Sequence, residues 1–186
     1  RLGLWIMDRA MQQRKAWNQE KLADFHVSVN VSSQQLNAPG FYRQVADILE
    51  KYQVPAKQLQ VEITETVALV ENAATRDNLL QLHDMGATIA MDDFGVGHSS
   101  LMYMRTMPID TLKIDGSLSR DVVKHPANLE IISTIYDLCR LLGVETIVEY
   151  VDNSEQLEKL KSVGTFLIQG YLFSPPVPSA EIPPFI

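Results

Sequence analysis

The 186-residue sequence predicts one α/β domain, residues 1–186, built on a parallel sheet. Three observations predict it: β-rich runs alternate with helical segments, several helices run into glycine, and polar residues gather near the carboxyl ends of the strands. Strands that alternate with helices imply right-handed crossovers between parallel strands. Two architectures remain open at this point, a doubly wound open sheet and a closed barrel.

The first element is a helix from Leu2 to about Trp17, whose apolar residues recur at nearly helical spacing: Leu4, Trp5, Met7, Met11 and Trp17. Since no capping residue precedes it, we expect the chain to start inside a longer domain. Six strands are expected at His26–Ser32, Gln58–Thr64, Thr88–Phe94, Thr111–Asp115, Glu145–Val151 and Phe166–Phe173. Five helices are expected between them, at Phe41–Tyr52, Ala73–Met85, Ser99–Met104, Ala127–Leu142 and Ser154–Val163.

Helix ends carry recognisable signals. Gly86, Gly143 and Gly164 each follow a helix, where we expect the left-handed backbone that glycine adopts at helix ends. Pro126 suits a first helical position, and Asn153 or Ser154 suits an N-cap.

Composition excludes several classes of protein. A net charge of −7 opposes binding to duplex nucleic acid, which requires a basic surface. No apolar run is long enough for a membrane span, so we expect no membrane contact from this segment. The single cysteine, Cys139, cannot form an internal disulfide, and it is expected to be a buried thiol in a cytoplasmic protein.

Strong polar groups lie near the carboxyl end of every expected strand. Parallel strands covered on both faces are normally almost entirely apolar, so these groups need an explanation. They are Asn30, Glu62, Asp92 with Asp93, Lys113 with Asp115, Glu149, and Gln169. In a parallel barrel they would meet at the mouth where active sites form.

Each of these residues also has a structural interpretation. Asn30 or Gln169 alone could be a hydrogen-bonded core residue, and Lys113 alone could form a structural ion pair. Several carboxylates at matched strand ends repel one another unless a cation offsets them, and oxygen donors favour Mg²⁺ or Mn²⁺. Gly95 and Gly97 follow the aspartate pair and predict a mobile loop beside it.

Five segments, in order and spacing, resemble the signature of EAL phosphodiesterase domains. They are Val29–Ser32, Glu62–Glu65, Asp92–Leu101, Leu112–Asp115 and Gln169–Tyr171. The resemblance covers essentially the whole chain. It implies a modified (β/α)8 TIM-like barrel, of which about six strands are present here. It also implies hydrolysis of cyclic di-GMP to linear pGpG, with two bound ions of Mg²⁺ or Mn²⁺.

The resemblance also implies roles for individual residues. Asn30, Glu62, Asp92 and Asp93 would be metal ligands. Glu149 would be the general base, Lys113 would contact a phosphate or the attacking water, and Gln169 would orient water. Glu65 would brace the glycine loop. The residues expected to contact substrate or to form this loop are Glu65, Gly95, Gly97, Ser99 and Asp152.

The sequence departs from the family pattern in three places. The Glu-x-Leu motif, with a metal-binding glutamate, would lie upstream of residue 1, so the first two strands are expected to be missing. The family's Glu-Gly-Val-Glu stretch is Glu149-Tyr150-Val151-Asp152, in which the tyrosine could crowd the site or tilt Glu149. The usual tyrosine of the glycine loop is His98.

Three functions are compatible with these residues. The first is an active cyclic di-GMP phosphodiesterase in the intact parent. The second is a catalytically inactive domain that binds cyclic di-GMP or a protein partner, and the third is another metal-dependent barrel enzyme acting on a phosphorylated metabolite. An incomplete barrel exposes strand edges, so we expect a homodimer or pairing with the missing N-terminal segment. The parent is expected to be cytoplasmic or the C-terminal part of a membrane-anchored sensor.

Overall fold

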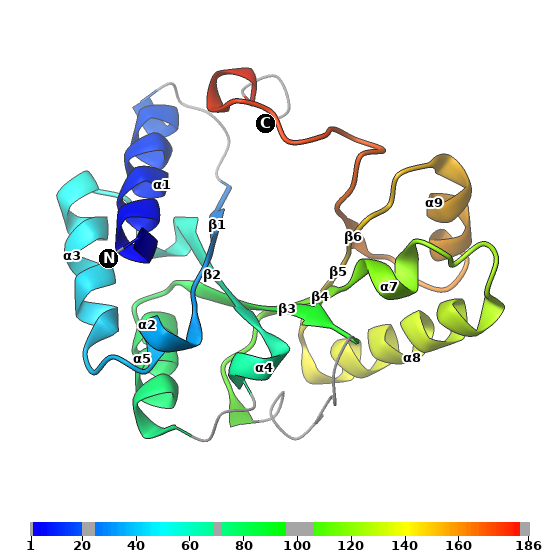
Figure 1. The fold of residues 1–186 in the computed structure, drawn as a ribbon, viewed down its shortest axis with the longest axis horizontal. Coiled ribbons are helices and arrows are strands. Elements are labelled where there is room, and N and C mark those ends of the chain that lie inside the picture. The colour runs from blue at the N-terminus through cyan, green and yellow to red at the C-terminus, as the bar shows by residue number, and fades with distance from the viewer. Residues whose placement is uncertain (1, 20–24, 69–71, 96–105, 183–186) are drawn as a thin grey trace. The chain divides into compact units, whose positions relative to one another are not determined.

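The computed structural model describes residues 2–19, 25–68, 72–95 and 106–182 (Figure 1). Strand order follows chain order from β1 to β6, and the recorded pairings are parallel, which confirms the predicted α/β class. The chain divides into two compact units. Unit 1 comprises residues 1–63, 67–89 and 177–186, and unit 2 comprises residues 64–66 and 90–176.

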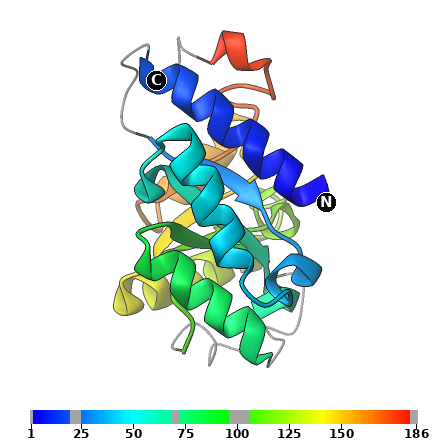
Figure 2. The ribbon, with the colours of Figure 1, turned by 90° about the vertical axis from the view of Figure 1, so that its left-hand side faces the viewer.

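Unit 1 contains β1 (Val27–Asn30) and β2 (Leu59–Thr64, of which Thr64 belongs to unit 2), and its helices pack in one layer. α1 (Leu2–Gln19), α3 (Phe41–Tyr52) and α5 (Ala73–Asp84) lie side by side (Figure 2). In α1 the buried face is Met7, Met11, Arg14 and Trp17, whereas Trp5 is 57% exposed. The predicted helix is therefore correct, but Trp5 lies off its buried face.

Arg14 is fully buried in unit 1, which the apolar pattern did not indicate. Its guanidinium donates to the Phe25 carbonyl at 3.1 Å and to Asn18 Oδ1 at 2.6 Å, and it lies over the Phe25 ring. These contacts satisfy the charge, as a buried cation requires.

Two short helices of unit 1 were not predicted. α2 (Ser33–Leu36) follows β1 directly and begins with a capping box between Ser32 and Gln35. α4 (Glu65–Ala68) begins at the end of β2, with its first residues in unit 2. Two 3₁₀ turns, Ala56–Gln58 and Ser179–Glu181, complete the unit.

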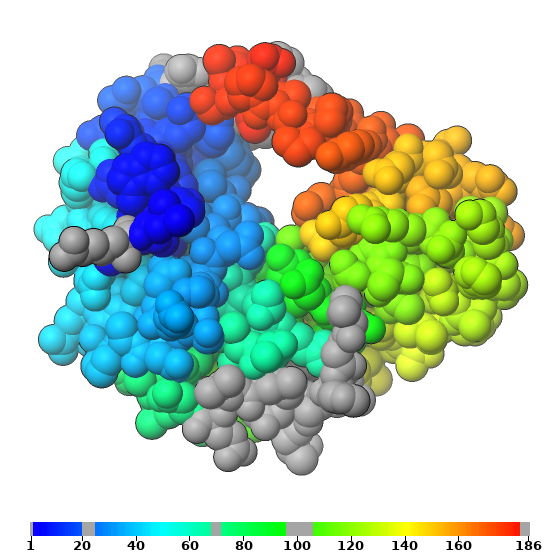
Figure 3. All heavy atoms as spheres, in the orientation of Figure 1, coloured from blue at the N-terminus to red at the C-terminus, as the bar shows by residue number. Residues whose placement is uncertain are grey.

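Unit 2 contains the carboxyl part of β3 (Thr88–Phe94) with β4 (Thr111–Ile114), β5 (Glu145–Val148) and β6 (Leu167–Ile168). Its helices are α7 (Gly116–Ser119), α8 (Pro126–Leu142) and α9 (Ser154–Lys161). α7 and α8 pack against each other, and their side chains are adjacent in Figure 3. The helix expected at Ser99–Met104 lies outside the described residues.

β5 and β6 are shorter than predicted. After β5 the backbone turns, because Tyr150 has a left-handed φ of 55°. After β6, Phe173 donates its amide to the Gly170 carbonyl at 3.2 Å and closes a turn where extended chain was expected. Both strands therefore end where the polar residues begin.

The helix-end predictions are correct except at Gly164. Gly86 and Gly143 are left-handed (φ 97° and 72°), Pro126 is the first residue of α8, and Asn153 caps α9. Gly164 has no positive φ. A Cβ there would lie 2.8 Å from the Tyr136 ring, so glycine is needed for close packing and not for a left-handed turn.

Candidate functional site

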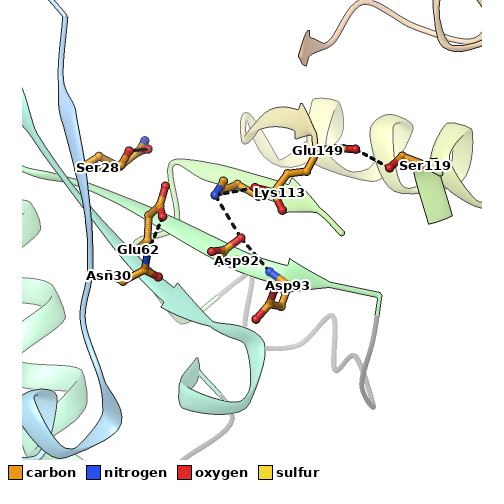
Figure 4. A network of polar contacts seen from close by, with 9 residues as sticks. Ser28, Asn30, Glu62, Asp92, Asp93, Lys113, Ser119 and Glu149 are labelled. Carbon is orange, nitrogen blue, oxygen red and sulfur yellow. Dashed lines mark hydrogen bonds and ion pairs between the residues drawn. The ribbon is translucent and has the colours of Figure 1, made fainter. Parts of the chain in front are cut away.

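The first polar cluster lies in unit 1, at the carboxyl ends of β1 and β2. Asn30 is the last residue of β1 and pairs in register with Glu62 of β2. The Asn30 side-chain amide donates to Glu62 Oε2 at 3.3 Å (Figure 4). Two residues earlier, Ser28 donates to Gln60 at 2.8 Å. The alternation of β1 thus places Ser28 and Asn30 on its exposed side while Val29 is buried.

The second cluster lies in unit 2 and centres on Lys113. Its ammonium is 3.2 Å from Asp92 Oδ1 and 2.8 Å from Glu149 Oε1, with the lysine side chain only 5% exposed. Figure 4 shows Lys113 directed toward both carboxylates. Asp92 comes from β3, Lys113 from β4 and Glu149 from the end of β5, which are successive parallel strands. Parallel register is therefore what brings these three residues together.

A bulge in β3 sets the position of the aspartate pair. Met91 pairs with Leu112 and Phe94 with Ile114, so three steps on β3 match two on β4. Asp93 has a φ of 58° and donates its amide to Asp92 Oδ1 at 3.0 Å. Bulges re-aim side chains beside functional sites. Here the bulge lets Asp92 face Lys113 while Asp93 stays exposed.

The environment of Asp93 disfavours its ionised form. Partial burial raises the pKa of Asp93, and the neighbouring carboxylates of Asp92 and Asp115 raise it further. Lys113 opposes this shift without cancelling it. An unoffset negative charge of this kind is what a bound cation would relieve.

The remaining predicted residues are more scattered. Gln169 follows β6 and is exposed, and its backbone N–H donates a hydrogen bond to the Val148 carbonyl at 3.0 Å. Asp152 Oδ1 accepts the Tyr171 amide at 3.0 Å, so this acid has a structural role. Gly95 is left-handed (φ 104°). Gly97 and Ser99 lie outside the described residues.

Glu65, the first residue of α4, is 5% exposed. Neither of its carboxylate oxygens has a hydrogen-bond partner among the described residues. Buried carboxylates are normally satisfied by donors or cations. Glu65 is therefore a buried acid with both carboxylate oxygens unsatisfied among the described residues.

Sequence patterns did not identify two residues that hold the second cluster. Ser119 donates its hydroxyl to the Glu149 carbonyl, and nothing in its surroundings in the sequence indicates this contact. Gln156 bonds to the carbonyls of Ser119 and Arg120 at 3.2 and 3.1 Å. The capping-box spacing of Asn153 and Gln156 was a signal that could have found it.

The oxygen donors of the two clusters bear on metal binding. No group of three or more His, Cys, Asp or Glu side chains within the described ranges is placed to hold an ion. Smaller sets of oxygen donors are present, Asn30 beside Glu62 in unit 1 and the consecutive Asp92 and Asp93 in unit 2. Mg²⁺ commonly uses one or two carboxylates and keeps several waters. The chemistry of the donors therefore fits a hard divalent cation.

The comparison with protein families matches residues 1–176 to the EAL domain. The chain belongs to the EAL domain family. It is 36% identical over 185 residues to the signaling protein YkoW of Bacillus subtilis, covering all of this chain and 23% of YkoW. It is 33% identical over 177 residues to the cyclic di-GMP phosphodiesterase PdeF of Escherichia coli, covering 95% of this chain and 24% of PdeF.

Solved structures of EAL proteins have the same fold. The EAL domain of Mycobacterium smegmatis DcpA gives a TM-score of 0.93 at 31% identity, covering 100% of this chain and 83% of that chain. The PaMucR phosphodiesterase in complex with c-di-GMP gives 0.91 at 32% identity, covering 97% and 73%. This EAL chain spans only about a quarter of the curated relatives YkoW and PdeF.

Among the described residues, no helix of this EAL chain is both long and apolar enough to cross a membrane. Cys139 is fully buried, and burial raises the pKa of its thiol, as expected for a structural cysteine.

Proposed function

We propose that the parent protein hydrolyses cyclic di-GMP to linear pGpG. The observation that carries this proposal is the buried Lys113, whose ammonium joins Asp92 and Glu149 at the carboxyl ends of adjacent strands in a chain of the EAL family. Two relatives support the choice of substrate, the cyclic di-GMP phosphodiesterases PdeB of Shewanella oneidensis at 34% identity and PdeF of Escherichia coli at 33% identity.

Glu149 is the general base of the proposed mechanism. Its carboxylate is held by Lys113 at 2.8 Å, and its carbonyl and amide are fixed by Ser119 and Ile114. Because both its backbone and its carboxylate are fixed, the Glu149 side chain keeps one orientation, in which it can take the proton of an attacking water. The Lys113 ammonium stabilises the negative charge that develops on the phosphate oxygens.

Asn30 and Glu62 are the proposed metal ligands of unit 1, and Asp92 and Asp93 those of unit 2. We propose Mg²⁺ or Mn²⁺, as two ions, because every donor is oxygen. When bound, these ions would supply Lewis-acid stabilisation of the phosphate charge. In this proposal the Gln169 side chain orients water, and Glu65 braces the glycine loop that begins at Gly95. Gly97 and Ser99, which are expected in the same loop, lie outside the described residues.

Duplex nucleic acid is not a partner in this proposal, because the net charge is −7. A homodimer, or pairing of exposed strand edges with an N-terminal segment, is the proposed assembly, and a cytoplasmic position is the proposed location. Sedimentation of the intact parent with and without cyclic di-GMP tests the assembly. A monomer under both conditions would contradict the homodimer.

The proposed function is tested by turnover of the intact parent. Cyclic di-GMP is supplied with Mg²⁺ or Mn²⁺, pGpG is followed by chromatography, and binding is measured in Ca²⁺. We expect pGpG, and we expect Asp92→Asn to lower its rate at least about 100-fold. Asp121→Asn is the control, because Asp121 is a surface residue paired with Lys124, and it should keep the wild-type rate.

Two results would contradict the proposal. Binding without product would make the domain a receptor for cyclic di-GMP. Neither binding nor product would exclude this nucleotide as the ligand and favour a protein partner or another phosphorylated substrate.

A further inference from the structure

Tyr150 has an unusual backbone for its residue type. Its φ of 55° lies in the left-handed region, which side chains with a Cβ disfavour, and it stands where the related motif has glycine. It is the residue directly after Glu149, and the residue as a whole is 42% exposed. A tyrosine held in this conformation needs contacts that compensate for it.

The Tyr150 ring lies against both ends of α7. The Arg120 guanidinium carbon is 4.0 Å from the ring centroid, a close cation–π contact. At the other end, a Cβ on Gly116 would lie 2.7 Å from Cγ of Tyr150, so the ring fills the space that glycine leaves open. The ring therefore packs on α7, and the Lys113–Glu149 ion pair of 2.8 Å forms with the tyrosine in place.

α7 in turn holds the backbone of Glu149. Ser119, its last residue, donates its hydroxyl to the Glu149 carbonyl. On the far side of Tyr150, the Asp152 amide donates to Gln156 Oε1 at 2.8 Å, and Gln156 Nε2 donates to the Ser119 carbonyl. The chain is thus tied to the end of α7 on both sides of Tyr150.

We propose that Tyr150 is a positioning residue, whose ring clamps α7 so that Ser119 keeps the Glu149 carboxylate on Lys113. The inference rests on the proposed function, in which Glu149 accepts the proton. In this proposal the tyrosine supports the position of Glu149 and does not obstruct the site. Gly116 and Arg120 are part of the same arrangement, because the Tyr150 ring packs against both residues.

The test is the steady-state kinetics of three variants of the intact parent. Tyr150→Ala removes the clamp and should lower kcat about tenfold with KM nearly unchanged, because misorientation of a base affects the transition state and not ground-state binding. Tyr150→Phe keeps the ring and should keep the wild-type kcat. Gly116→Ala should lower kcat as Tyr150→Ala does, because its new methyl group displaces the ring.

A double variant gives the sharpest check. Gly116→Ala combined with Tyr150→Gly has no ring to displace, so its kcat should equal that of Tyr150→Gly alone. A raised KM with unchanged kcat in Tyr150→Ala would mean that the ring contacts substrate, and would overturn the proposal. An unchanged or increased kcat in Tyr150→Ala would overturn it too.

Failure of the proposed function is recognised separately. If the wild-type parent produces no pGpG, crystal structures of the wild type and Tyr150→Ala decide the positioning claim. The claim predicts that Glu149 Oε1 leaves Lys113 Nζ in the variant. An ion pair retained at its wild-type length would overturn it.

Discussion

Lys113 is the residue on which the chemistry of unit 2 depends, because one buried ammonium serves two carboxylates from neighbouring strands. Without it, the carboxylates of Asp92 and Glu149, which are 14% and 9% exposed, would lose the ammonium that offsets both charges. The same lysine therefore has a structural and a chemical role. The two roles are separable, since stability and turnover are measured independently.

Replacing Lys113 with methionine should abolish turnover, with kcat reduced at least about 100-fold, because the charge on the phosphate loses its stabilising cation. It should also lower the free energy of unfolding by about 3–5 kcal/mol, the usual cost of breaking a buried pair. Urea denaturation and pGpG assays measure the two effects.

Lys159→Met is the matched control for Lys113→Met, because Lys159 lies on the exposed side of α9. Its unfolding free energy should stay within about 0.5 kcal/mol of wild type. Near-wild-type turnover in Lys113→Met would refute the role assigned to the ammonium.

At the level of elements, a side chain of α5 holds the turn between α2 and α3. Asn78 of α5 is fully buried and donates to the Leu36 and Ala38 carbonyls at 2.8 and 2.9 Å, while it accepts the Tyr42 amide at 3.0 Å. It therefore fixes the chain between α2, which follows the strand of Asn30, and α3.

Asn78→Ala should lower the free energy of unfolding by about 2–4 kcal/mol, because it leaves buried backbone groups without partners. Asn72→Ala removes only the N-cap bond to Ala74 and should cost about 1 kcal/mol. Thermal and urea unfolding of the two variants compare them directly. Equal losses of unfolding free energy in the two variants would show that the three hydrogen bonds of Asn78 stabilise the fold no more than a single N-cap bond.

The elements that local patterns predict are those with strong local signals. The bounds of α3 and β3 are as predicted, because apolar periodicity and flanking glycines or polar residues define them. α2, α4 and α7 were missed, since a four-residue helix has too little periodicity to detect. The ends of β5 and β6 depend on turns at Tyr150 and Gly170, which long-range contacts stabilise.

The candidate site shows the same division. Side-chain alternation along the strands and position at strand ends predicted Asn30, Glu62, Asp92, Lys113 and Glu149 as candidates. In the structure Asn30 bonds to Glu62 in unit 1, and Lys113 contacts Asp92 and Glu149 in unit 2. The bulge at Asp92–Asp93 and the bracing by Ser119 were not predictable, because they depend on the register between strands and on a residue thirty positions away.

At the scale of the whole molecule, the chain is an EAL domain that matches solved EAL structures over nearly its full length. It spans about a quarter of the length of its curated relatives YkoW and PdeF. The activity of the parent therefore has to be measured on the intact protein. The proposed base of cyclic di-GMP hydrolysis is Glu149, held on Lys113.

Single-turnover formation of pGpG by the intact parent carrying Glu149→Gln tests this role. We expect the variant to bind cyclic di-GMP in Ca²⁺ as wild type does but to form pGpG at least about 100 times more slowly. Glu145→Gln, at the amino end of β5, should match wild type. Wild-type rates in Glu149→Gln would exclude Glu149 as the base.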